Sequence, residues 1–108
     1  MNEDLSFNSA QELVAQMTEK YNLEISPELR YIDLASEVGE LGKEILLSTD
    51  YGKNQFDATD NLESEIGDTF YSLICIANSL DIKLSNALIK VIKKYEQRFS
   101  EKGNIGSE

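Results

Sequence analysis

The sequence LASEVGELGKEI (residues 34–45) contains the pattern on which the fold prediction rests. Within it, residues 37–40 read acid, β-branched apolar residue, glycine, acid, and the segment EIGD (residues 65–68) repeats that order. The acids of each pair are three positions apart, so on a helix they share one face. Around both segments apolar residues recur at helical spacing, which predicts a helix through each acidic pair.

The same spacing along the rest of the chain predicts an all-α fold of four helices. The expected ranges of these helices are about 9–20, 27–47, 60–80 and 84–101. Ser9, Ser26 and Asp60 are the expected N-caps, because their side chains can accept a hydrogen bond from the first helical turn. Gly103 is placed to end the last helix. The long connection at residues 48–59 is rich in turn-forming residues and is expected to be a surface loop.

Each predicted helix carries a stripe of apolar residues, and the stripes are expected to face inward and form a shared core. The stripes of the second and third helices consist of Tyr31, Leu34, Val38, Leu41, Ile45, Leu62, Ile66, Phe70, Leu73 and Ala77. Both acidic pairs lie on the same side of these stripes. If the two helices pack antiparallel, as neighbours joined by a dozen residues should, the pairs meet at similar heights on one side of the interface.

The composition restricts the chemistry that is available. The 108 residues include 20 acidic and 10 basic side chains, which gives a net charge of −10, with no histidine and one cysteine. Histidine catalysis, histidine-bound zinc and an internal disulfide are therefore excluded. The negative charge disfavours nucleic-acid polymers and membranes as partners. We expect a single soluble, cytoplasmic domain over residues 1–108, without a targeting segment and with poorly ordered tails at about 1–8 and 104–108.

Four carboxylates that converge on one point need a positive charge between them. Each acidic pair taken alone would more commonly be a solvated helix face, and only the two pairs together point to a site. Oxygen ligands without histidine or cysteine favour a hard ion, Mg²⁺ with Mn²⁺ as the alternative. Because Mg²⁺ usually also binds phosphates of a substrate, the pattern predicts a metal site for a phosphorylated small molecule.

The fourth predicted helix carries Lys90, Lys94 and Arg98 in one line, at spacings of four residues. One interpretation is an ordinary solvated face. The other is a set of cations that offsets the charge of a polyphosphate, with Arg98 able to form two parallel hydrogen bonds to phosphate. Lys93, next to this line, is expected to face solvent.

The order ExxE, 24 intervening residues, ExxD resembles the signature of the MazG-like all-α nucleotide pyrophosphohydrolases. LASEVGELGKEI and ESEIGDTFYSLICIANSLDI (residues 63–82) are similar to the two metal-binding helices of that family, and LSNALIKVIKKYEQRF (residues 84–99) is similar to the following helix. The resemblance implies a four-helix MazG-like bundle whose antiparallel second and third helices carry the metal site. It also implies that oligomerisation completes the bundle, as a homodimer or a dimer-based homotetramer.

The activity implied by the resemblance is Mg²⁺-dependent hydrolysis of nucleoside triphosphates, ribo or deoxy, to the monophosphate and pyrophosphate. Its biological role would be house-cleaning of the nucleotide pool. The implied metal ligands are Glu37, Glu40, Glu65 and Asp68, and the implied phosphate-binding residues are Lys94 and Arg98. Glu37 and Glu40 are also the implied catalytic residues, although which carboxylate takes the proton from water is left open.

The chain departs from the family pattern at three positions. Ser36 and Ser64 stand where many relatives have a further glutamate, which puts an additional metal site in doubt, and Ile92 replaces an asparagine. No residue can be assigned to a base or sugar pocket. The aromatic candidates, which could equally pack in the core or a loop, are Tyr31, Tyr51, Phe56 and Tyr71. Two alternative functions stay open: hydrolysis of another pyrophosphate-containing metabolite, and a non-catalytic helical interaction module.

Overall fold

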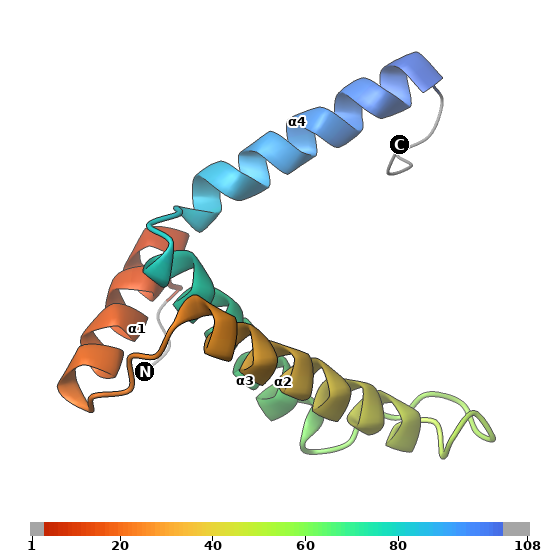
Figure 1. The fold of residues 1–108 in the computed structure, drawn as a ribbon. Coiled ribbons are helices and arrows are strands. Elements are labelled where there is room, and N and C mark those ends of the chain that lie inside the picture. Colours follow the sequence, from red (N-terminus) through yellow and green to blue (C-terminus); the bar gives the residue numbers. More distant parts are fainter. Residues whose placement is uncertain (1–3, 103–108) are drawn as a thin grey trace.

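The computed structural model describes residues 4–102 and contains four helices in that range (Figure 1). They are α1 (Phe7–Lys20), α2 (Pro27–Leu47), α3 (Leu62–Ser79) and α4 (Leu84–Lys102). No strand occurs among the described residues, so the predicted all-α class with four helices is confirmed. Gly103 and the tail at 104–108 lie outside the described residues.

The start of α2 follows the prediction from its sequence. The Ser26 Oγ accepts a hydrogen bond from the Leu29 N–H at 3.2 Å, which satisfies one of the free donors of the first turn. Pro27 occupies the first helical position, where its missing N–H costs no hydrogen bond. The predicted N-cap and helix start are both confirmed.

The start of α1 differs from the prediction. Its N-cap is Ser6, whose Oγ accepts a hydrogen bond from the Ser9 N–H at 3.0 Å. Ser9 therefore lies inside the first turn and does not cap it, because the earlier serine reaches the same free donors first. The chain is helical from Phe7, so the tail expected at about residues 1–8 overlaps the first two residues of α1.

The start of α3 is also displaced from the predicted cap. Asn61, not Asp60, is the N-cap, and it makes no side-chain capping hydrogen bond. Its backbone is already close to helical, with φ −87° and ψ −9°, and the Leu62 N–H donates to the Thr59 carbonyl at 3.2 Å. A backbone turn thus leads directly into α3, so the carboxylate of Asp60 is not needed as a cap.

The loop at residues 48–59 is organised around the buried Ser48. The Asp57 N–H donates to the Ser48 carbonyl at 2.7 Å, and the Thr59 N–H donates to the Ser48 Oγ at 3.3 Å. The Thr59 hydroxyl in turn donates to a carboxylate oxygen of Glu44 at 2.6 Å. These bonds hold both ends of the loop against the end of α2, and the predicted surface loop is confirmed.

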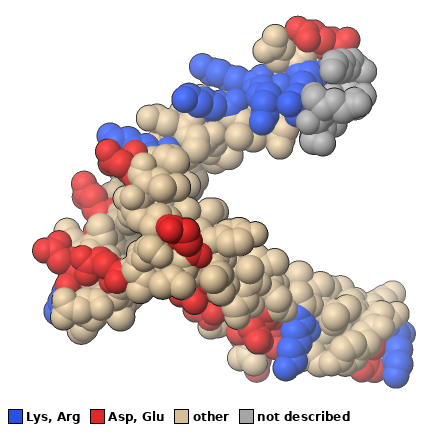
Figure 2. Space-filling model, in the orientation of Figure 1, with Lys and Arg blue, Asp and Glu red and all other residues tan. Residues whose placement is uncertain are grey.

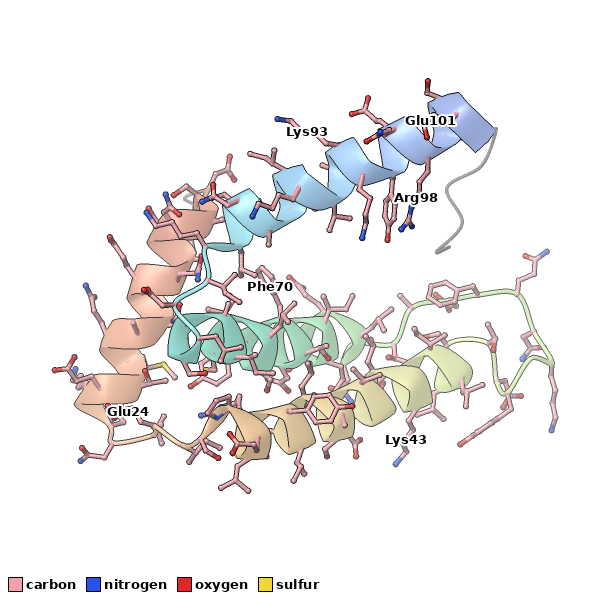
Figure 3. The ribbon with its side chains drawn as sticks, turned by 45° about the horizontal axis from the view of Figure 1, so that its top comes forward. Glu24, Lys43, Phe70, Lys93, Arg98 and Glu101 are labelled. Carbon is pink, nitrogen blue, oxygen red and sulfur yellow. The ribbon has the colours of Figure 1, made fainter. Side chains whose placement is uncertain are left out.

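Helices α2 and α3 lie antiparallel and form the main packed pair, while α1 packs across the C-terminal end of α3 (Figures 1 and 3). Gln11 of α1 fixes this junction through its side-chain amide. Its Nε2 donates to the Asn78 Oδ1 at 3.0 Å and to the Ile82 carbonyl at 2.9 Å. Its Oε1 accepts from the Leu84 N–H at 2.9 Å, so one side chain links α1, the end of α3 and the start of α4.

Helix α4 extends away from the α2–α3 pair (Figure 1). The chain turns by 101° between α3 and α4, whereas an antiparallel return along α3 would need a turn near 180°. The packing partner of α4 is α1. Within residues 4–102 no single helix is long and apolar enough to span a membrane, and α3 and α4 meet that requirement of length and composition only as a bent pair.

The apolar stripes expected to face inward are largely exposed. Tyr31 is 63% exposed, Val38 51% and Ile66 53%. The buried apolar residues among those described are Ile74, Cys75 and Ala77. The radius of gyration is 16.9 Å, compared with about 13 Å for a compact domain of this length. The expectation of an inward core is therefore wrong for the single chain, because four splayed helices cannot enclose their own apolar faces.

Candidate metal centre and active site

Three carboxylates from α2 and α3 meet at the interface between these helices. One oxygen atom from each of Glu37, Glu65 and Asp68 lies within 4.8 Å of the other two. Glu37 and Glu65 are half-buried and Asp68 is exposed. Thr69 holds the helices in register at this point: its hydroxyl donates to the Glu65 carbonyl at 2.8 Å and lies 3.4 Å from the Glu37 carbonyl. The antiparallel pair thus brings three of the four acids of the two motifs together.

The fourth acid, Glu40, is exposed one turn further along α2 and lies outside this group of three. Its charge nevertheless acts on the group, because it contributes to raising the pKa of Glu65. Glu40 is therefore an electrostatic neighbour of the three carboxylates, which we call the acidic cluster (Glu37, Glu65 and Asp68).

The pKa of Glu65 is raised above its ordinary value of 4.5. The largest cause is partial burial, which disfavours the charged carboxylate. Repulsion from nearby carboxylates raises it further, in the order Asp68, Glu37, Glu40 and Glu44. A divalent cation bound among these oxygens would offset that repulsion, and an all-oxygen donor set suits a hard ion. The residues present therefore fit a Mg²⁺ or Mn²⁺ site.

Glu44 is a neighbour of the cluster that the sequence interpretation did not include. It lies seven residues after Glu37, which is two helical turns, so both side chains are on the face of α2 that meets α3. Its carboxylate accepts the hydrogen bond from Thr59 described above. The seven-residue spacing is the signal that could have identified it, but such spacings are frequent in a chain with 20 acidic residues.

The raised pKa of Glu65 predicts a pH dependence of stability when no divalent metal is present. Between pH 4.5 and the raised pKa, the folded chain holds more of the Glu65 proton than the unfolded chain does. The contribution of Glu65 to the free energy of unfolding therefore falls as the pH rises through this range. Urea unfolding in chelator, compared between the parent and Glu65→Gln, measures this contribution. A parent that instead gains stability relative to the variant over this range would contradict the prediction.

The two predicted phosphate-binding residues lie on α4, apart from the acidic cluster of the same chain. Lys94 is exposed and Arg98 half-buried. Arg98 points to the side of α4 that faces α3, and Lys93 points to the opposite side (Figure 3). With 1.5 Å of rise per residue and the 101° turn, Arg98 lies more than about 20 Å from Asp68. A single chain therefore does not bring these cations to the cluster.

The charges are distributed unevenly over the surface. In the view of Figure 2 the largest group of visible lysine and arginine side chains lies on α4, and most of the visible acidic side chains lie on the rest of the molecule. Helix α4 and the more acidic remainder of the chain are thus complementary in charge, but they lie apart within one chain.

These features define a class of protein: an all-α protein whose antiparallel helix pair carries a carboxylate cluster suited to a divalent cation. Comparison with known families places the chain within that class. The model of the MazG nucleotide pyrophosphohydrolase domain matches residues 25–101, which include α2, α3 and most of α4. The chain belongs to the MazG nucleotide pyrophosphohydrolase family.

Individual relatives agree with this assignment. The YpjD protein of Bacillus subtilis strain 168 is 38% identical over 88 residues, which cover 79% of this chain and 75% of that protein. Its crystal structure has a TM-score of 0.74 at 33% identity, covering 91% of this chain and 99% of that one. The crystal structure of the Bacillus-conserved MazG protein, a nucleotide pyrophosphohydrolase, has a TM-score of 0.73 at 30% identity, covering 86% and 92%.

Proposed function

We propose that the protein hydrolyses nucleoside triphosphates, ribo or deoxy, to the monophosphate and pyrophosphate in a reaction that depends on Mg²⁺. The observation that carries the proposal is the convergence of three carboxylates from the two acidic motifs. Membership of the MazG family supports a nucleotide as the substrate. In the cell such an activity would serve house-cleaning of the nucleotide pool, in the cytoplasm.

The proposed metal ligands are Glu37, Glu65 and Asp68, with Glu40 as the fourth carboxylate from α2. Mg²⁺ is preferred to zinc because the cluster offers only oxygen atoms, and Mn²⁺ could replace it. Bound Mg²⁺ would offset the charge of the polyphosphate and lower the pKa of the attacking water.

The proposed reaction is an attack by water on the α-phosphorus. The water oxygen forms the new bond, the bond from the α-phosphorus to the oxygen that bridges to the β-phosphate breaks, and pyrophosphate leaves. The proton of the water passes to a carboxylate, Glu37 or Glu40, which acts as general base. Of these two, Glu37 is half-buried and Glu40 is exposed.

Product identification tests this function directly. The full chain, incubated with a panel of ribo- and deoxynucleoside triphosphates and Mg²⁺, is expected to release nucleoside monophosphate and pyrophosphate in equal amounts. Turnover should stop on chelation and return with Mg²⁺ or Mn²⁺. Release of orthophosphate with nucleoside diphosphate would overturn the proposed bond cleavage, and no turnover of any nucleotide would overturn the function.

The same proposal includes an assembly, a homodimer or a dimer-based homotetramer. Its support is the apolar surface that one chain leaves uncovered on α3 and α4, where Phe70 is 41% exposed, Ile92 47% and Phe99 59%. Exposed apolar side chains in such number are characteristic of protein interfaces, and closed two-fold dimers are the commonest assembly.

In this assembly, α4 of one copy supplies Lys94 and Arg98 to the acidic cluster of the other. Two observations support the arrangement. Lys94 and Arg98 lie more than about 20 Å from the acidic cluster of their own chain. Helix α4 is also basic, whereas the rest of the chain is more acidic. A triphosphate between the two copies would then contact the metal on one side and the cations on the other.

A further inference from the structure

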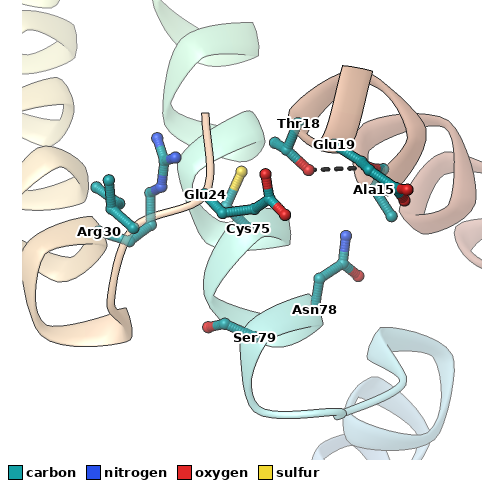
Figure 4. Close-up of a pocket in the computed structure, with 9 residues that line it drawn as sticks. Ala15, Thr18, Glu19, Glu24, Arg30, Cys75, Asn78 and Ser79 are labelled. Carbon is teal, nitrogen blue, oxygen red and sulfur yellow. Dashed lines mark hydrogen bonds between the residues drawn. The ribbon is translucent and has the colours of Figure 1, made fainter. Parts of the chain in front are cut away.

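A cavity of about 260 Å³ lies between the end of α1, the connection from α1 to α2, and α3 (Figure 4). Its apolar lining includes Ala15, Ile25 and Cys75. The carboxylate of Glu24 points into it, toward Asn78 (Figure 4). The volume is close to the lower end of the range for small-molecule sites, so the cavity suits one ring system and not a whole nucleotide.

This cavity lies on the same side of the α2–α3 pair as the acidic cluster. On α3, Asp68 and Cys75 are seven residues apart, so both lie on one face, two helical turns or about 10 Å from each other. On α2, Arg30 lines the cavity and Glu37 belongs to the cluster, again seven residues apart. A nucleoside, whose sugar separates the base from the phosphates, can bridge such a distance.

Tyr71 lies on α3 between Asp68 of the cluster and Cys75 of the cavity lining. Tyr71 is three residues after Asp68 on α3, and its ring is 5.7 Å from the Arg30 guanidinium carbon. Burial raises the pKa of Tyr71, and a hydrogen bond with Cys75 raises it further, so its hydroxyl stays protonated and engaged. A half-buried aromatic ring therefore lies on α3 between the acidic cluster and the cavity. Such a ring suits contact with a sugar or base and not with phosphate.

Several polar side chains around the cavity already donate hydrogen bonds to backbone carbonyls. The Asn78 amide donates to the Gln11 carbonyl at 3.0 Å, and the Thr18 hydroxyl to the Ala15 carbonyl at 2.9 Å. Arg30 donates to the Leu23 carbonyl at 2.9 Å. Ser79 likewise donates to a carbonyl of its own helix.

Glu24, by contrast, is exposed and accepts no hydrogen bond within the described part of the chain. Its carboxylate is therefore available to a ligand beside the apolar walls of the cavity. A ligand group that donates hydrogen bonds satisfies this acceptor, whereas a carbonyl oxygen placed there would be repelled by the carboxylate.

We propose that this cavity binds the base of the nucleotide, and that Glu24 selects cytosine and adenine over uracil, thymine and guanine. C4 of cytosine and C6 of adenine carry an N–H₂ donor, whereas C4 of uracil and thymine and C6 of guanine carry a carbonyl oxygen. The inference rests on the proposed nucleotide hydrolysis, because the acidic cluster sets the position of the phosphates.

Two measurements test the proposal. The first compares kcat/KM for CTP and ATP with that for UTP, in their ribo and deoxy forms, and the parent is expected to prefer the amino-bearing bases at least about 10-fold. The second measures binding of the products CMP, AMP and UMP by calorimetry in the presence of Mg²⁺, which offsets the repulsion between the acidic cluster and the phosphate. Because these products are not hydrolysed, the measurement needs no turnover. The same order of affinity is expected, with UMP weakest.

Glu24→Gln separates this role from a structural one. Its amide can donate to a carbonyl oxygen as well as accept, so UMP binding should strengthen and CMP binding weaken, and the preference should fall about 10-fold or more. Glu28→Gln, an exposed first-turn residue outside the cavity, is the matched control and should leave the preference unchanged.

The outcomes distinguish this inference from the proposed function. Hydrolysis of all bases at equal rates, or a preference that Glu24→Gln leaves intact, would overturn the base assignment while the hydrolase function stands. Absence of hydrolysis together with tighter binding of CMP than UMP would overturn the function and retain the cavity as a base site. Equal binding of the three monophosphates would overturn the cavity assignment in either case.

Discussion

Replacing Asp68 with asparagine is expected to reduce turnover of the preferred triphosphate at least about 100-fold, because the loss of one charged ligand removes several kcal/mol of stabilisation from the metal-bound transition state. The change keeps the size of the side chain. Without metal the variant should be as stable as the parent or slightly more stable, since one source of repulsion on Glu65 is removed. Steady-state kinetics and urea unfolding in chelator measure the two effects.

Glu40→Gln is expected to have an effect on turnover of similar size, although Glu40 lies outside the group of three in the structure. Glu63→Gln is the matched control, because it removes an exposed charge from the same helix as Asp68 without touching the cluster. Parent rates with Mg²⁺ in both Asp68→Asn and Glu40→Gln would show that the metal site is wrongly assigned. A reduced rate in Asp68→Asn alone would remove Glu40 from the ligand set.

The location of the acidic cluster is the part of the site that the sequence predicts best. Helical spacing placed the acids of ExxE and ExxD on matching sides of two helices, and antiparallel packing of α2 and α3 brings Glu37, Glu65 and Asp68 together. Only local information was required, namely the period of the helix and the connection of a dozen residues between sequential neighbours. The same reasoning could not place the exposed Glu40 side chain, whose conformation is not fixed by packing.

The direction of the apolar faces could not be predicted from periodicity. An apolar stripe indicates that a helix face is buried, but not whether the same chain or a second copy buries it. Val38 and Ile66 belong to regular stripes and are nevertheless half exposed or more. Periodicity does not predict the direction of α4 either. This direction is set at the short break before Leu84, where Asp81 adopts a left-handed backbone with φ 55°.

The cavity beside Glu24 was missed for a related reason. Glu24 lies in the connection between α1 and α2, where no helical period assigns a direction to its side chain. Its orientation depends on how α1 packs against the end of α3, through the contacts of Gln11 and Asn78. These residues are far apart in the sequence, and no local motif marks them.

Arg98→Ala is expected to reduce kcat/KM by roughly 10- to 150-fold, since an arginine–phosphate hydrogen bond contributes about 1.5–3 kcal/mol. Lys93→Ala, on the opposite side of α4, is the control and should stay within about twofold of the parent. Equal small effects at Lys93, Lys94 and Arg98 would mean that all three belong to a solvated face.

Mixing subunits then tests where Arg98 acts. Light scattering should first give at least twice the chain mass of 12.2 kDa, and a stable species of the chain mass would exclude the arrangement. If α4 serves the partner's cluster, a dimer of one Arg98→Ala and one Asp68→Asn subunit contains one site with both the carboxylate and the cation intact. Random mixing of the two impaired variants should therefore give roughly a quarter of the parent activity, above that of either variant alone. If the cation instead served its own chain, every site in the mixture would lack one group and the activity would not rise above the average of the two variants. Because both variants keep the apolar faces that join the copies, recovery or its absence reports on the path of α4 and not on assembly.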